Sequence, residues 1–246
     1  QLSSTPAARG EIVNVGTGYV TRDRLFDRIE IITYRDYVGV SSALLLFVAL
    51  VAPDVICPDR RQRVLPLMFA RPLIGRDYVA AKVGAITTIL FLFSFLPQVV
   101  LFIGNMLVSN SAFDYLTDHL DVLWKVPMAV LVLAVQYAVI GVAAASLTDR
   151  RIVAGASIIG LFLVTSIAAG VIVGDNVGRR GGSLAALLNV LALPLQLRDV
   201  IFLGQVDPRG TLNGTSGGGW LALAAYLVVV GIGLAVLLRR YRWVER

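Results

Sequence analysis

The sequence predicts an all-α, polytopic helical membrane protein, and its composition and hydropathy carry that prediction. Of its 246 residues, 57% are hydrophobic and only 15% are charged, whereas about a quarter of the residues in a typical soluble domain are charged. Mean hydropathy is +0.78. The apolar residues also lie in long uninterrupted runs, which a bilayer requires and a globular core does not. These properties favour a single membrane domain.

Five of these runs are long enough to cross about 30 Å of hydrocarbon, which takes roughly 20 helical residues at about 1.5 Å each. We expect spans at about 37–56, 84–107, 126–147, 152–173 and 220–238. The first is the least regular, because Pro53 and Asp54 lie near its end. A sixth apolar stretch, at about 184–203, is too short to span and is interrupted by polar residues and proline. It favours a re-entrant or interfacial pair of helices before the last span.

Lysine and arginine predict the orientation, because they are in excess in cytoplasmic loops. They cluster in the loop at 57–83, in the turn that holds Arg150 and Arg151, and in the carboxyl-terminal tail. All three are cytoplasmic in one topology, which places the opening segment, 1–36, outside the cytoplasm. Strongly charged segments cross membranes reluctantly, so we expect a preceding span that is cleaved or omitted, rather than unaided translocation. Six spans are then expected in the native protein.

Several kinds of chemistry are excluded by the residues that the sequence lacks. His119 is the only histidine and Cys57 the only cysteine, so an HExxH metal site, a Ser-His dyad in the bilayer, an internal disulfide and a cysteine-based metal site cannot form. No GxxxxGK[ST] phosphate loop occurs, so the chain itself is not expected to hydrolyse ATP. The net charge is +6. The basic residues lie in short clusters beside apolar runs, as expected for contacts with lipid headgroups and not with nucleic acid. We predict no catalytic and no metal-binding residues.

Polar residues in the interiors of the expected spans are few and uncharged, which disfavours an ion-coupled secondary transporter. Gln98, Gln136 and Tyr137 are the most notable. They either form hydrogen bonds between packed helices or line a path for an amphipathic substrate. Small residues such as Gly141 and Gly155 allow helix backbones to approach closely and favour the packing interpretation.

The loop from Asp59 to Lys82 reads DRRQRVLPLMFARPLIGRDYVAAK. Its central apolar residues are flanked by arginines, so a short helix here can lie along the membrane surface and contact a cytoplasmic partner. The alternative is an ordinary basic cytoplasmic loop.

Within this loop, the run ARPLIGRDYVAAK resembles the corresponding loop of ABC-2-type permeases, the transmembrane subunits of one class of ABC transporter. The matching positions are Ala70, Arg71, Pro72, Arg76, Tyr78 and Lys82. Gln62, Arg63 and Val64 stand where the family usually has Gly-Thr-Leu. The order of the spans, with a re-entrant stretch before the last one, is also similar.

The resemblance implies a permease domain at 37–246 that dimerises with an identical or a different subunit and pairs with a separate ATPase, which binds the ATP and Mg²⁺. The loop at 57–83 would hold the coupling helix that contacts this ATPase. Its candidate coupling residues are Asp59, Arg60, Arg61, Arg71, Pro72, Arg76 and Lys82. The expected function is export of an amphipathic or lipid-like substrate or a drug across a bacterial inner membrane. The alternative is a membrane scaffold that anchors a cytoplasmic partner without transport.

Overall fold

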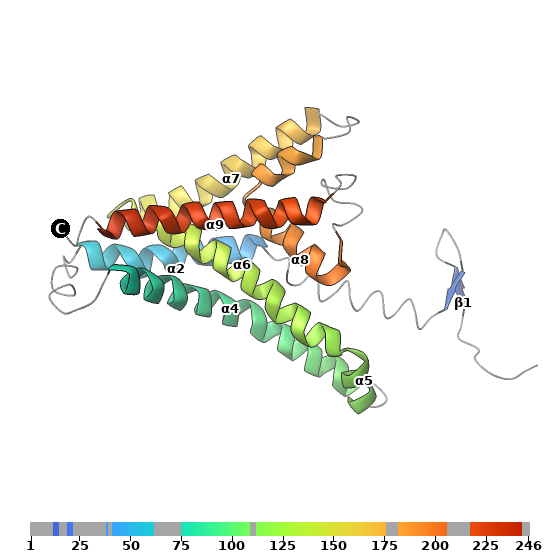
Figure 1. The fold of residues 1–246 in the computed structure, drawn as a ribbon. Coiled ribbons are helices and arrows are strands. Elements are labelled where there is room, and N and C mark those ends of the chain that lie inside the picture. The colour runs from blue at the N-terminus through green and yellow to red at the C-terminus, as the bar shows by residue number, and fades with distance from the viewer. Residues whose placement is uncertain are drawn as a thin grey trace, which may run out of the picture.

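A computed structural model describes residues 12–14, 19–21, 38, 41–61, 75–108, 112–175, 182–205 and 217–242 (Figure 1). Its helices are α2 (Ser41–Arg61), α4 (Gly75–Val108), α5 (Ala112–Asp118), α6 (Leu120–Ser146), α7 (Arg151–Asp175), η1 (Gly182–Leu188, a 3₁₀ helix), α8 (Leu193–Leu203) and α9 (Gly218–Arg242). Two short strands, β1 (Ile12–Asn14) and β2 (Tyr19–Thr21), pair antiparallel, with Val13 opposite Val20. The predicted all-α fold therefore describes every element except this small hairpin.

Among the described residues, four helices are long and apolar enough to cross a membrane: α4, α6, α7 and α9. They contain the second to fifth expected spans. The first expected span overlaps α2, whose apolar part, Ser42–Pro58, is shorter. At about 1.5 Å per residue this part is about 25 Å long, less than the usual hydrocarbon thickness. The first expected span, at 37–56, therefore stays a prediction.

Helix α6 is the centre of the bundle. It packs against α2, α4, α7, α8 and α9, and 67% of its most apolar window is buried, compared with 22% for α4 and 17% for α7 and α9. The outer surfaces of those three helices carry large exposed apolar side chains such as Val100, Val164 and Ile232. An apolar surface of this kind is stable against lipid and not against water.

Glycines determine how closely α6 and α7 approach α2. A Cβ atom added at Gly141 of α6 would lie 2.7 Å from Cγ2 of Val48, and one added at Gly155 of α7 would lie 2.9 Å from the backbone oxygen of Ala49. Both distances are too short for a real side chain. The packing role expected for these small residues therefore agrees with the contacts in the structure.

The stretch expected at 184–203 forms the helix pair η1 and α8. Helix η1 lies against α7, and α8 packs against α6 and α9. Pro194 occupies the first turn of α8, where a missing N–H costs nothing, and α8 ends at Gly204, whose φ of 70° is left-handed.

The expected loop at 57–83 is shorter in the structure, because both neighbouring helices extend into it. Helix α2 continues past Pro53 to Arg61, and α4 begins at Gly75. The segment GRDYVAAK continues the apolar helix without a break, since Ala and Lys are good helix formers and Asp77 lies in the first turn, where an acidic side chain is favourable. Residues 62–74 lie outside the described part of the chain.

Candidate functional site

One end of the bundle gathers the segments that the charge pattern assigned to the cytoplasm. The end of α2, the start of α4, the α6–α7 turn and the end of α9 lie together, on the left of Figure 1. The Lys82 ammonium of α4 donates to the carbonyl oxygen of Val55 in α2 at 3.1 Å. Tyr78 of α4 contacts Tyr241 of α9 with ring centroids 5.0 Å apart. These long-range contacts join α2, α4 and α9 at this end.

This end, which we call the cationic end, is rich in positive charge. Among the side chains that the structure describes, it carries Arg76, Lys82, Arg150, Arg151, Arg239 and Arg240, against Asp54, Asp77 and Asp149. The opposite end carries fewer such cations. This distribution is the one that the positive-inside rule associates with the cytoplasmic side of a membrane protein.

An open groove of about 1190 Å³ lies at the cationic end, between α2 and the α6–α7 turn. Its walls include Pro53, Cys57 and Arg150. The Arg151 Nε atom lies 2.5 Å from Oδ1 of Asp54, so an ion pair connects the two walls. Both side chains are about half exposed, and such pairs contribute little stability on their own.

The predicted coupling residues belong to the end of α2, the start of α4 and the segment between these helices. Asp59, Arg60 and Arg61 are in the last turn of α2, although their side chains lie outside the described set. Arg71 and Pro72 fall in the segment that the structure does not describe. Arg76 and Lys82 are in the first turns of α4, and the Arg76 side chain is exposed to solvent.

Two of the three polar residues named as candidates for a substrate path form hydrogen bonds between helical segments. The Gln136 Nε2 atom donates to the carbonyl oxygen of Val190 at 2.7 Å, and the Tyr137 hydroxyl donates to that of Leu191 at 3.3 Å. These carbonyls lie in the break between η1 and α8, where no helical N–H is available to them. Gln136 and Tyr137 therefore attach the helix pair to α6, as the packing interpretation predicts.

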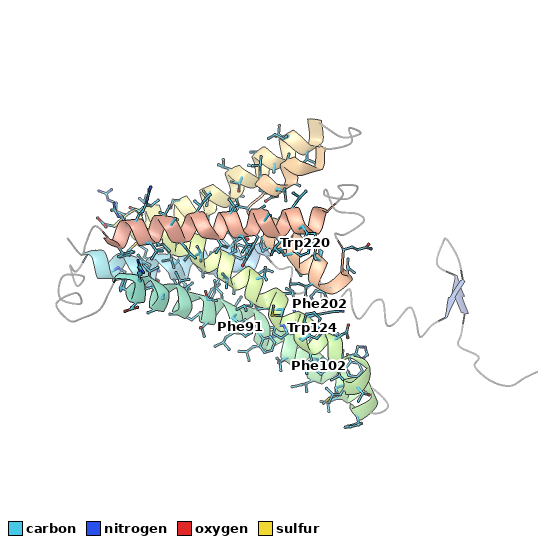
Figure 2. All side chains as sticks on the ribbon, viewed as in Figure 1. Phe91, Phe102, Trp124, Phe202 and Trp220 are labelled. Atoms are coloured by element: carbon cyan, nitrogen blue, oxygen red, sulfur yellow. The ribbon has the colours of Figure 1, made fainter. Side chains whose placement is uncertain are left out.

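Gln98 differs from these two residues. Its side chain is 2% exposed, and neither Oε1 nor Nε2 has a hydrogen-bond partner among the residues described. It lines a small groove between α4 and α6, together with apolar side chains that include Phe95, Phe102 and Val126. Figure 2 shows Phe102 and Trp124 near the end of the bundle that carries α5, away from the cationic end.

A buried ion pair in α8 was not predicted from the sequence. Arg198 donates from Nε and Nη2 to Oδ1 of Asp199 at 2.9 and 2.7 Å, and the two side chains are only 8% and 12% exposed. Charged residues at the end of a short apolar stretch are usually solvated at a membrane surface, so the sequence gives no reason to predict that Arg198 and Asp199 are buried. Their adjacency with opposite charge was the available signal.

Comparisons with known proteins identify no relative. No family model matches the chain, and no curated protein or solved structure matches it.

Proposed function

We propose that this protein is the transmembrane subunit of an ATP-driven exporter of the ABC-2 type, which pairs with a separate ATPase subunit and with a second permease subunit. One observation carries the proposal: among the described side chains, α4, the α6–α7 turn and α9 bring basic residues to a single end of the bundle, where an open groove lies beside Arg150 and Arg151. A cytoplasmic partner with an acidic surface fits this end by charge. The chain itself has no phosphate-binding loop, so the ATP and Mg²⁺ belong to that partner.

Helix α4 supplies a mechanical connection between the partner and the membrane interior. It is one continuous helix of 34 residues, about 50 Å long. Arg76 is at its cationic end, and Gln98 is 22 residues further along, about 33 Å away. Pro97 precedes Gln98 inside the helix, and proline is where a helix bends most readily. ATP-driven closure of the partner would displace the Arg76 end and bend α4 near Gln98.

The substrate in this proposal is amphipathic, because the spanning helices offer apolar surfaces and isolated hydrogen-bonding groups, and no charged binding site within the described spans. Gln98 keeps its place as a candidate substrate contact. Gln136 and Tyr137 are already engaged with the carbonyls between η1 and α8. The proposed location is the inner membrane of a bacterium, with the cationic end and the carboxyl terminus in the cytoplasm.

Charge reversal at the cationic end tests this proposal. The full-length protein is purified with its associated proteins, and ATP hydrolysis is measured for wild type, Arg76→Glu and the matched control Lys125→Glu, which reverses a charge near the opposite end of α6. We expect Arg76→Glu to weaken association with the ATPase and to lower hydrolysis by about tenfold, the effect of losing roughly 1.4 kcal/mol. Lys125→Glu leaves both unchanged.

A membrane scaffold without transport is the alternative that remains, because it would use the same cationic end. A partner that lacks ATPase activity but is lost with Arg76→Glu would identify the scaffold. Equal behaviour of Arg76→Glu and Lys125→Glu would exclude the cationic end as the docking surface in both cases.

A further inference from the structure

The amide of Gln98 is an unusual group to find inside a membrane helix bundle. Burying an amide without a hydrogen-bond partner costs about 1–3 kcal/mol by mutational data, and more in an environment as apolar as hydrocarbon. Both polar atoms of the Gln98 amide are buried, and neither finds a partner within the described residues. An apolar residue such as leucine would avoid this cost. The site therefore has a donor and an acceptor ready for a molecule outside the chain.

The groove beside Gln98 shows what kind of molecule fits. Its volume is about 70 Å³, far below the roughly 300–1,000 Å³ of pockets that enclose a whole drug-sized ligand. Its walls are apolar side chains of α4 and α6, and it is open on one side. It is therefore suited to part of an apolar chain whose remainder lies in the surrounding lipid.

The amide of Gln98 supplies both hydrogen-bonding functions, because Nε2 can donate and Oε1 can accept. This combination matches a hydroxyl or similar neutral group, which both donates and accepts, and it gives no stabilisation to a bare hydrocarbon.

We propose that the groove between α4 and α6 binds an amphiphile with one apolar chain, whose neutral hydrogen-bonding group pairs with the Gln98 amide. The inference rests on the proposed function only in treating this amphiphile as the transported substrate. Binding itself needs neither ATP nor the ATPase. Rotation about the terminal torsion of Gln98 turns its amide toward the bound group, and that torsion has a broad, shallow profile.

Photolabelling in lipid nanodiscs tests the site. The full-length protein is irradiated with a long-chain alkanol that carries a diazirine at mid-chain, or with the alkane of the same length and the same diazirine. Labelled positions are located by mass spectrometry. The lipid-facing surface of α7 around Val164 and Ile167, both more than half exposed, serves as an internal control for non-specific labelling.

We expect saturable labelling of the groove that is roughly tenfold stronger for the alkanol than for the alkane, the ratio that corresponds to about 1.4 kcal/mol. The α7 surface is labelled equally by both probes. Gln98→Leu, or Gln98→Met if the first variant does not fold, removes the alkanol preference and leaves the α7 labelling unchanged. Equal groove labelling by the two probes in wild type would overturn the proposal. An alkanol preference that survives both substitutions would also overturn the proposal. Finding that only water occupies the site beside Gln98 would overturn it as well.

These outcomes are distinct from those of the ATPase measurement. A wild-type protein that binds an ATPase but shows no alkanol preference would refute the amphiphile site alone. A wild-type protein that shows the alkanol preference but binds no ATPase would refute the coupling proposal alone.

Discussion

The contact between α2 and α7 at Gly155 provides a matched pair of substitutions. A Cβ atom at Gly155 would lie 2.9 Å from the backbone oxygen of Ala49, whereas one at Gly160, in the same helix, would meet nothing within 4 Å. The obstacle at Gly155 is backbone, so it cannot rotate away. Gly155→Ala and Gly160→Ala gain the same helix propensity, about 1 kcal/mol, and this gain cancels when the two variants are compared.

The difference between the two variants is therefore the cost of overpacking, about 1–3 kcal/mol. We expect Gly160→Ala to be as stable as wild type or up to about 1 kcal/mol more stable, and Gly155→Ala to be less stable than Gly160→Ala by that difference. The assay is reversible unfolding in mixed micelles by added denaturing detergent, followed by circular dichroism. Equal unfolding free energies for the two variants would show that α2 does not pack on α7 as described.

Three further predictions concern the polar contacts of the bundle. Gln136→Leu should lower the unfolding free energy by about 1–3 kcal/mol because it removes the hydrogen bond to the part-buried carbonyl of Val190. Gln98→Leu should not lower it, and the same detergent titration measures both. Asp199→Asn should destabilise the protein by about 3–5 kcal/mol because it removes the carboxylate that pairs with the buried Arg198. The double variant Arg198→Met, Asp199→Leu should recover most of the loss; a double variant as unstable as the single one would contradict this. Arg151→Ala, which removes a half-exposed ion pair, should change the unfolding free energy by less than about 1 kcal/mol.

Hydropathy predicts the long helices well because a bilayer imposes length and composition on every span. The prediction of apolar spanning helices is confirmed for α4, α6, α7 and α9. For α4, the expected span of 84–107 ends within one residue of the helix but begins nine residues after it, on the charged side. At α4, the segment Gly75–Val83 looks like a loop by charge, but helical geometry continues through it. Hydropathy marks the edge of the membrane, whereas backbone hydrogen bonding decides where a helix begins.

The role of individual polar residues was harder to predict, because their partners are distant in the sequence. Gln136 and Tyr137 each bond to a carbonyl 54 residues away, and a single sequence contains no sign of that pairing. The isolation of Gln98 is equally invisible, since it depends on which residues fail to reach it. The burial of Arg198 and Asp199 likewise depends on how α8 packs against α6 and α9.

The central claim is that a cytoplasmic ATPase binds the cationic end, and site-specific crosslinking tests it most directly. A photoreactive phenylalanine analogue is placed instead of exposed Arg150, in the α6–α7 turn, or instead of Lys125, near the other end of α6. The full-length protein is then irradiated in its native membrane. We predict that the analogue at position 150 crosslinks to an ATPase with a phosphate-binding loop, and that the analogue at position 125 does not. Crosslinking of an ATPase from position 125 alone, or of no ATPase from position 150, would contradict the proposed coupling.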